Sequence, residues 1–171
     1  MKAIVCMTPQ GGIGHKNKIP WKSRLDLQYF REITEGNGNN AIVMGRKTFQ
    51  SMNNRPLPRR RNYIMTKDAS ISNHYIHDIV VESNVQNIVL LDLIFDDVFI
   101  IGGSEIYKLF ENFITTIYVT YIETIFPCDR YFPINLTNFK KTIIKETVDE
   151  KKQKLVFCVY YRIDNDCMNL L

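Results

Sequence analysis

Residues 98–107 read VFIIGGSEIY, and this stretch decides the fold class. Four apolar residues predict a short buried strand, two glycines follow it, and the residues after them have the spacing of a helix. Residues 41–52, AIVMGRKTFQSM, repeat the same order with a single glycine. Apolar strands that lead into helices through glycine turns are typical of an open, mostly parallel α/β sheet.

The beginning of the chain fits the same plan. Residues 2–7 are almost uniformly apolar, which predicts a strand at the centre of the sheet, covered on both faces. Residues 9–22 show neither a helical nor a strand period, so we expect a functional loop there. Ser23 is expected to cap a helix that ends at Gly36. The apolar stripe of this helix consists of Leu25, Leu27, Phe30 and Ile33.

Later segments change from crossover units to strands alone. A strand is expected at residues 62–65 and a helix at 84–93. Strands then follow at 115–123, around Tyr131, at 140–148 and at 155–163, and the charged turn 149–154 joins the last two into an antiparallel hairpin. We see no repeat or linker, so residues 1–171 are expected to form one domain.

The composition excludes several classes of protein. With 45% apolar and 12% aromatic residues, the 171-residue chain can build a core, which excludes intrinsic disorder. No apolar run approaches the roughly 20 residues of a membrane span, and residues 1–8 lack the features of a signal peptide. The four cysteines have no C-x-x-C spacing, which favours reduced thiols over disulfides or zinc. We therefore expect a soluble protein of the cytoplasm with no membrane association.

The net charge of +4 is compatible with nucleic-acid binding or with small anionic ligands. The densest basic cluster, Arg55, Arg59, Arg60 and Arg61, is interrupted by Pro56 and Pro58. Such a rigid segment differs from a basic helix or a polybasic tail. The pattern favours a small anion over a nucleic acid.

Two glycine turns are candidate anion sites, because ligands of open α/β sheets bind at the carboxyl ends of strands. After Gly45, the cations Arg46 and Lys47 open a helix at its positive end, which indicates an anionic ligand or a pair of solvated surface charges. Gly102 and Gly103 would let a pyrophosphate approach the backbone, or form only a tight turn. The G-x-G-x-x-G fingerprint is not found.

Asp26 is the third candidate. It lies between two leucines on the expected helix and four residues before Phe30, so it faces partly inward. Burial would raise the pKa of its carboxyl, and such groups cluster at functional sites. The alternative is a first-turn acid that faces solvent.

Several short segments follow one another in a fixed order along the chain. They are Ala3-Ile4-Val5-Cys6, Gly12-Ile13-Gly14, Ile19-Pro20-Trp21, Asp26-Leu27, Phe30, Ile42-Val43-Met44-Gly45-Arg46-Lys47-Thr48-Phe49, Asn54-Arg55-Pro56-Leu57, Ile101-Gly102-Gly103-Ser104, Ile106-Tyr107 and Tyr118-Val119-Thr120. Taken together and in order, these segments resemble the dihydrofolate reductase family. The resemblance implies an α/β fold with a central eight-stranded, mostly parallel mixed sheet, an antiparallel C-terminal hairpin and about four flanking helices. It also implies reduction of 7,8-dihydrofolate to 5,6,7,8-tetrahydrofolate by hydride transfer from NADPH.

The resemblance assigns the substrate side of the site. Asp26 would orient the pterin and promote protonation of N5, Thr120 would hydrogen-bond this acid, and Trp21 would hold an ordered water. Arg60 would take the α-carboxylate of the glutamate tail, which explains the basic cluster without nucleic acid. The implied substrate-binding residues are Ile4, Val5, Cys6, Asp26, Leu27, Phe30, Met52, Arg55, Leu57, Arg60, Ile101, Tyr107 and Thr120.

The resemblance also assigns the cofactor side, with a cis peptide between Gly102 and Gly103 and a mobile loop over residues 12–21 that closes on the nicotinamide. No metal is implied. The implied NADPH-binding residues are Cys6, Met7, Ile13, Gly14, Lys18, Ile19, Gly45, Arg46, Lys47, Thr48, Met65, Thr66, Lys67, His77, Ile101, Gly102, Gly103, Ser104, Glu105, Ile106 and Tyr107.

Some positions depart from the family pattern. Arg59 stands where the family usually has glycine, so Arg61 could compete with Arg60 for the carboxylate. Cys6 replaces a residue that is commonly alanine, and Asn53-Asn54 lengthens a connection by one residue. Two other functions remain open: a pyrimidine reductase of riboflavin synthesis on the same architecture, and a non-catalytic binding module. Asp26 together with Arg60 favours folate.

The resemblance further implies a monomer that supplies tetrahydrofolate for one-carbon metabolism, hence for thymidylate, purine and glycine synthesis. Its partners would be small molecules: dihydrofolate and antifolate inhibitors.

Overall fold

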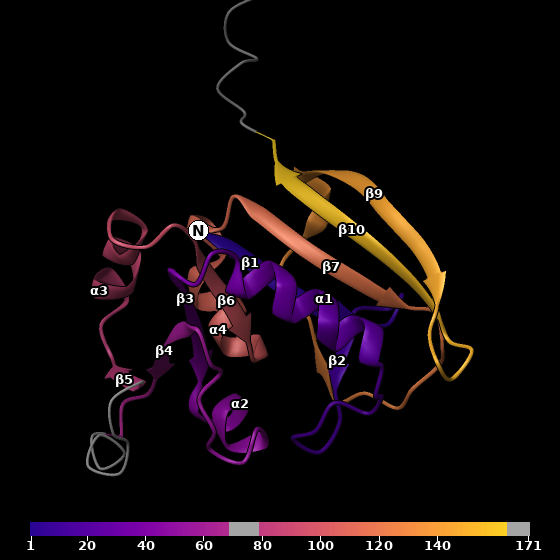
Figure 1. The fold of residues 1–171 in the computed structure, drawn as a ribbon, viewed down its shortest axis with the longest axis horizontal. Helices are drawn as coiled ribbons and strands as arrows, with labels where there is room; N and C mark the ends of the chain where they lie inside the picture. Colours follow the sequence, from indigo (N-terminus) through magenta and orange to yellow (C-terminus); the bar gives the residue numbers. More distant parts are fainter. Residues whose placement is uncertain (69–78, 164–171) are drawn as a thin grey trace, which may run out of the picture.

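The structure, a computed structural model, describes residues 1–68 and 79–163. Within them, one sheet has the strand order β5-β4-β3-β6-β1-β7-β10-β9, and β2 and β8 form a separate pair (Figure 1). The strands are β1 (Lys2–Met7), β2 (Gly12–Gly14), β3 (Asn40–Gly45), β4 (Arg60–Met65), β5 (Ile79–Glu82), β6 (Val98–Gly102), β7 (Thr116–Ile122), β8 (Arg130–Tyr131), β9 (Phe139–Val148) and β10 (Lys154–Arg162).

The sheet is parallel except at its C-terminal edge. β1 lies between β6 and β7 and pairs with both in parallel, which confirms its predicted central position. β10 runs antiparallel to both β7 and β9, so the chain ends in the predicted hairpin. The predicted mixed, eight-stranded architecture is therefore confirmed.

In the described part of the chain, four α-helices flank the sheet: α1 (Arg24–Glu35), α2 (Arg46–Ser51), α3 (Val85–Val89) and α4 (Ser104–Phe110). α1 runs across the near side of the sheet in Figure 1, and α4 lies behind it. The ends of α1 follow the predicted signals: the Ser23 hydroxyl accepts a hydrogen bond from the Asp26 N–H at 3.4 Å, and Gly36 has a positive φ of 50° at the C-cap.

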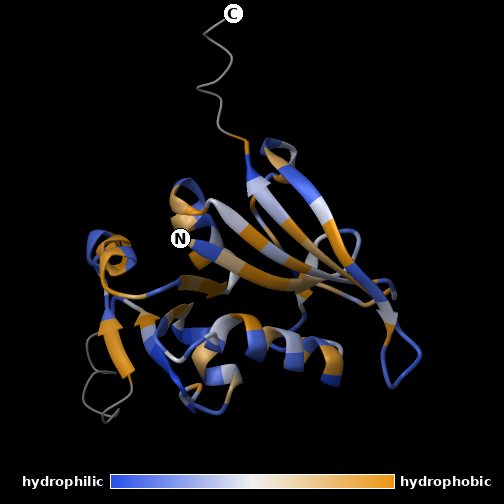
Figure 2. Ribbon diagram, turned by 45° about the horizontal axis from the view of Figure 1, so that its top comes forward, coloured by the Kyte–Doolittle hydropathy of each residue, from blue (hydrophilic) through white to orange (hydrophobic). Residues whose placement is uncertain are grey.

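The two faces of the sheet bury separate apolar clusters. Phe49 of α2 packs with Ile42 and Ile64 on one face, where Phe30 of α1 joins them. Phe110 of α4 belongs to the larger cluster on the other face. Figure 2 shows hydrophobic and hydrophilic bands alternating along α1, the pattern of a helix with one face on a sheet. Among the described residues, no helix is long and apolar enough to span a bilayer.

Several boundaries differ from the sequence prediction. The loop 9–22 contains β2, which pairs with β8 in a register broken by a bulge, and three residues are too few for a period to show in the sequence. β4 begins at Arg60, two residues early, because parallel pairing with β3 starts there. β5 was not predicted. The expected helix 84–93 is α-helical only to Val89 and continues as a 3-10 turn, Leu90–Leu93.

The apolar stripe of α1 is also less buried than predicted. Leu25 packs with the Trp21 cluster, while Phe30 and Ile33 pack with the cluster under α2. Leu27 joins neither cluster and remains 60% exposed. An exposed leucine at this point leaves apolar surface next to Asp26.

Candidate active site

Asp26 lies in the first turn of α1, where the helix passes over the centre of the sheet. Its carboxylate is partly buried and accepts hydrogen bonds from the side chains of Thr120 and Cys6. These two residues lie opposite each other in the parallel β1–β7 pair, so adjacent strands direct both groups at the same acid. Asp26 is thus both a first-turn acid and an inward-facing one.

Burial is the largest influence on this carboxyl and raises its pKa above the ordinary value of 3.8, although the bonds from Thr120 and Cys6 act in the opposite direction. Burial, and then the charge of Asp26, raise the pKa of the Cys6 thiol. Cys6 therefore stays a neutral S–H donor. The site combines one acid with neutral partners that hold it in place.

Trp21 supplies a further polar atom beside Cys6. Its ring is buried against Phe126, and its indole N–H approaches the Cys6 sulfur. Nε1 is nevertheless buried without a geometrically complete hydrogen bond among the described residues. A buried donor of this kind calls for a polar partner such as a water or a ligand atom.

Tyr107 connects the acid pocket to the glycine turn at the end of β6. Its hydroxyl donates to the Ile4 carbonyl at 2.7 Å, and burial raises its pKa far above the ordinary range, so it remains protonated. The ring of Tyr107 also lies under Gly102: a Cβ there would come within 2.9 Å of Cε2. Glycine at this position, which has φ +108°, lets strand β6 pass over the tyrosine.

The two predicted glycine turns lie side by side. Met44 pairs with Gly102 in the β3–β6 register, and a Cβ on Gly103 would lie 3.6 Å from the Thr48 hydroxyl. The peptide between Gly102 and Gly103 is cis, as expected. A Cβ on Gly45 would come within 3.0 Å of Ile106, so glycine is needed for the starts of α2 and α4 to approach this closely. Arg46 and Lys47 are exposed at this junction.

The loop after β1 is held by the segment around β8. The Gly12 N–H donates to the Thr8 hydroxyl at 3.0 Å, and the Lys16 N–H donates to Asp129 at 3.0 Å. The Ser104 hydroxyl donates to the Tyr131 carbonyl at 3.0 Å, which links β8 to the start of α4. The loop therefore meets the same strand ends as the glycine turns.

Arg60 is buried, with 8% of its surface exposed. Its Nε donates to the Pro58 carbonyl at 2.9 Å and its Nη1 to the Thr34 hydroxyl at 2.8 Å. Nη2 has no acceptor among the described residues. The guanidinium is thus fixed in orientation with donors to spare, the arrangement that suits a bidentate carboxylate.

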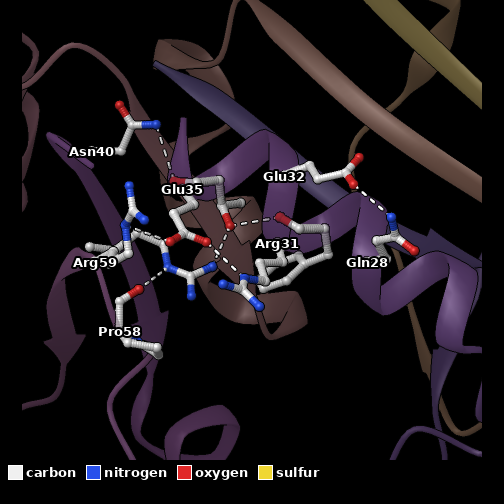
Figure 3. Close-up of polar contacts among 10 residues, drawn as sticks. Gln28, Arg31, Glu32, Glu35, Asn40, Pro58 and Arg59 are labelled. Atoms are coloured by element: carbon white, nitrogen blue, oxygen red, sulfur yellow. Dashed lines mark hydrogen bonds and ion pairs between the residues drawn. The ribbon is translucent and has the colours of Figure 1, made fainter. Parts of the chain in front are cut away.

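The neighbouring arginines take different directions. Arg59 has φ +59°, the left-handed conformation that glycine usually provides, so the turn keeps its shape without glycine. Its Nε lies 2.7 Å from Glu35, which also pairs with Arg31 at 2.8 Å (Figure 3). Arg61 is exposed and reaches the Tyr63 hydroxyl instead. The alternative in which Arg61 replaces Arg60 is therefore disfavoured by the geometry.

Some predicted residues do not join this arrangement. The side chain of Ile19 is 62% exposed, so it packs against nothing in the described core, and Lys18 and Arg55 are exposed as well. His77 lies outside the described residues. The other predicted residues fall on the expected elements: Val5 and Met7 on β1, Ile13 and Gly14 on β2, Met52 and Leu57 after α2, Met65 at the end of β4, Thr66 and Lys67 after it, Ile101 on β6, and Glu105 on α4.

Sequence reasoning missed Thr34 and Glu35, the buried residues of α1. The Thr34 hydroxyl donates to the Phe30 carbonyl at 2.7 Å and accepts from Arg60. The i,i+4 spacing of Arg31 and Glu35 was the available signal, but it also occurs in solvated pairs. Among the described residues, no three His, Cys, Asp or Glu side chains are grouped to hold a metal.

The arrangement defines a class of protein: an α/β protein in which two glycine turns lie side by side at the ends of parallel strands, and in which the first helix carries a partly buried acid. Comparison with known proteins agrees. The family model for dihydrofolate reductase matches residues 1–162. Curated dihydrofolate reductases from Staphylococcus haemolyticus and Aedes albopictus are each 34% identical, over 94% and 88% of both chains respectively.

A solved structure gives the same result. Dihydrofolate reductase from Enterococcus faecalis, complexed with NADP(H) and RAB-propyl, superimposes with a TM-score of 0.81 and 30% identity, covering 95% of this chain and 96% of that one. This chain therefore belongs to the dihydrofolate reductase family, whose members are NADPH-dependent oxidoreductases.

Proposed function

We propose that this protein reduces 7,8-dihydrofolate to 5,6,7,8-tetrahydrofolate with NADPH, and that Asp26 is the acid that orients the pterin and promotes protonation at N5. The observation that carries the proposal is the isolated carboxylate of Asp26, held by Thr120 and Cys6 beside the unpartnered indole N–H of Trp21. Family membership supports the reaction, and the geometry supports the role of the acid.

Asp26 can form two parallel hydrogen bonds with the pterin N3–H and 2-amino group. Such charge-assisted pairs are about twice as strong as neutral ones, and partial burial limits screening by water. The negative charge favours a cationic pterin, so it raises the proton affinity of N5. Because the carboxylate is several bonds away from N5, it acts by polarising the ring, while the proton comes from solvent.

Thr120 and Cys6 act on this acid rather than on the reacting atoms. Thr120 and Cys6 donate to the carboxylate, which fixes its plane across the β1–β7 pair. The Trp21 N–H is placed to hold a water between the indole and the pterin. Leu27 and Phe30 offer apolar surface that excludes bulk water from the ring.

The glycine turns and the residues that begin α2 and α4 would fit the phosphates of NADPH. A Cβ on Gly45 would meet Ile106 at 3.0 Å and a Cβ on Gly102 would meet Tyr107 at 2.9 Å, so these glycines allow the starts of α2 and α4 to lie close together, and a pyrophosphate would bind at the backbone there. Arg46, Lys47 and Thr48 would hold the phosphates from α2, and Ser104 to Tyr107 would follow them along α4. When bound, the cofactor supplies the hydride that reduces C6. Residues 12–21 would cover its nicotinamide and keep water from the hydride path.

Arg60 would anchor the far end of the substrate. Its guanidinium is oriented by Pro58 and Thr34, so it can take the α-carboxylate of the glutamate tail as a bidentate pair. Leu57 and Met52 would line the aminobenzoyl part. The distance between the Asp26 carboxylate and the Arg60 guanidinium would then set the length of substrate that the site accepts.

The proposal also covers the domain organisation, location and metabolic role of the protein. We expect residues 1–171 to form one domain that acts as a monomer in the cytoplasm. Its product would supply one-carbon metabolism, including thymidylate, purine and glycine synthesis, and antifolates would compete at Asp26. The basic turn is accounted for by a carboxylate, so no nucleic-acid partner is proposed.

The experiment is a spectrophotometric assay of NADPH oxidation with and without dihydrofolate, for the wild type and for Asp26→Asn. We expect oxidation that depends on dihydrofolate and falls by more than tenfold in the variant at neutral pH, with NADPH affinity unchanged. Undiminished turnover in Asp26→Asn across the pH range would refute the role of the acid. NADPH binding without turnover in the wild type would refute the substrate.

A further inference from the structure

The turn that joins β9 to β10, residues 149–153, lies beside the beginning of α1 (Figure 1). The Arg24 N–H donates to the Glu150 carboxylate at 2.9 Å, although the two residues are 126 positions apart in the sequence. Arg24 is the first residue of α1, and its N–H is one of the groups at a helix start that have no partner within the helix. The turn therefore supplies a cap from outside the helix.

Asp149 fixes the shape of this turn. It is 6% exposed, and its Oδ1 accepts the backbone N–H groups of Lys151 at 2.8 Å and of Gln153 at 2.9 Å. Burial acts to raise the pKa of its carboxyl, but these two hydrogen bonds and the contact with Ser23 outweigh burial and hold the pKa below the ordinary value of 3.8. Asp149 is therefore a charged acceptor inside the turn.

The same carboxylate meets the N-cap of α1. Ser23, the N-cap residue, is buried, and its hydroxyl approaches Asp149 as a donor. Oδ2 of Asp149 is buried without a geometrically complete hydrogen bond among the described residues, so it can take the Ser23 proton. The Ser23 oxygen in turn accepts the Asp26 N–H at 3.4 Å. One serine thus connects the carboxylate of the turn to the backbone of Asp26.

The turn is also joined to the other side of the acid pocket. β10 begins directly after the turn, and Phe157 of β10 lies opposite Thr120 in the antiparallel β10–β7 pair. Phe157 packs in one apolar cluster with Leu25 of α1. The hairpin therefore contacts both the helix that carries Asp26 and the strand that carries its partner Thr120. A displacement of the turn would move the acid relative to this partner.

Asp26 is the third residue of α1, so its position depends on where and how the helix begins. A group that binds a substrate has to be held within about 0.5 Å and 10–20° of its productive geometry. We propose that Asp149 and Glu150 are positioning residues that act through Asp26: they fix the first turn of α1 and thereby hold the acid against the pterin. The inference rests on the proposed function in assigning the pterin to Asp26.

The test measures single-turnover reduction of dihydrofolate by Asp149→Asn, alone and combined with Asp26→Asn. Asparagine keeps an oxygen for the two backbone N–H groups of the turn, but its amide nitrogen cannot accept from Ser23. The double variant distinguishes an effect through the acid from a general effect on the fold, since residues that act through one another are not additive. Thermal unfolding shows that each variant is folded.

Glu150 provides a second pair of variants, because it is exposed and its loss leaves the interior of the turn intact. Glu150→Ala removes the acceptor of the Arg24 N–H, and Glu150→Gln keeps one. Asp92→Asn is the matched control. It changes the charge exactly as Asp149→Asn does and breaks a 2.8 Å ion pair with the N-terminal ammonium, next to α3 and at the opposite end of the molecule from the turn (Figure 1).

We expect Asp149→Asn and Glu150→Ala to lower the rate at pH 7 about three- to tenfold. Glu150→Gln should restore most of the rate, and Asp92→Asn should leave it unchanged. In the Asp26→Asn background, Asp149→Asn should lower the rate less than about twofold.

Three results would overturn the positioning role: an unchanged rate in both Asp149→Asn and Glu150→Ala, an equal loss in Asp92→Asn, or the same loss from Asp149→Asn with and without Asp26. The turn would then serve only the stability of the fold. An undiminished rate in Asp26→Asn alone would instead refute the role proposed for the acid.

Discussion

Replacing Arg60 by lysine tests how the tail anchor is built. Arg60 donates to Pro58 from Nε and to Thr34 from Nη1, which turns the remaining donors toward the position proposed for the α-carboxylate. Lysine keeps the positive charge, but its ammonium is a point charge on a flexible stem and cannot form the parallel pair. The substitution therefore removes geometry while conserving charge.

The size of the effect follows from the contacts. A hydrogen bond to a charged group contributes about 1.5–3 kcal/mol, and lysine loses one of the two bonds to the carboxylate. With a factor of ten for each 1.4 kcal/mol, KM for dihydrofolate should rise about 10- to 150-fold. Since the anchor is far from the reacting atoms, it contributes equally to ground and transition states, and kcat should change much less.

Steady-state kinetics with dihydrofolate at saturating NADPH measures both parameters, and thermal unfolding checks that the variant is folded. Thr34→Val is a matched second variant, because it removes the acceptor that orients Arg60 without touching the arginine. We expect a smaller rise in KM there. An unchanged KM in Arg60→Lys, combined with a large rise in Arg61→Lys, would show that the wrong arginine has been assigned to the carboxylate.

Three further predictions concern stability. Burial raises the pKa of Asp26 above 3.8, so ionisation of this carboxyl weakens the fold as the pH rises through the raised value. Asp26→Asn should therefore unfold at a higher temperature than the wild type at pH 7. A lower unfolding temperature for the variant would contradict the upward shift of the pKa. Glu35 behaves oppositely, because its lowered pKa stabilises the fold above pH 4.5 and this contribution is lost on acidification. In urea titrations, the free energy of unfolding of Glu35→Gln should therefore fall less steeply on acidification than that of the wild type. Gly102→Ala should lower the free energy of unfolding by about 1–3 kcal/mol or more, since its Cβ would meet Tyr107 at 2.9 Å and φ is +108°. Gly11→Ala, with φ +80° and nothing within 4 Å, is its control, and equal losses in the two would refute the steric part of the argument.

The central strands were predictable because their sequence signals are local. β1, β3 and β6 are continuous apolar runs, and the glycine turns after β3 and β6 directly follow their strands, so pattern alone placed both the sheet and the two glycine turns. The caps of α1 were predictable for the same reason, since Ser23 and Gly36 act on adjacent backbone groups.

Elements that depend on distant pairing could not be predicted. β2 has three residues, and β8, placed only roughly around Tyr131, has two; each exists because the other lies beside it. β4 extends back to Arg60 because β3 is its parallel neighbour, which also determines that Arg60 faces inward and Arg61 outward. Arginine side chains are mostly exposed in folded proteins, so residue type alone would not have predicted a buried arginine here.

The acid pocket was predictable in part. The position of Asp26 between leucines indicated an inward-facing carboxyl, but not its partners, because Cys6 and Thr120 are brought to it by the β1–β7 register. The Thr34–Arg60 bond and the Arg31–Glu35–Arg59 cluster join α1 to β4 and the turn before it, across 24 or more residues of sequence, and no spacing rule connects them.

The most direct test of the central claim is the pH dependence of dihydrofolate reduction by the wild type and by Asp26→Asn, measured from NADPH oxidation under single-turnover conditions. We predict that the variant loses most of its rate at neutral pH and recovers part of it in acid, where solution protonation of the pterin replaces the polarising charge. Equal rates for the two proteins at every pH would contradict it.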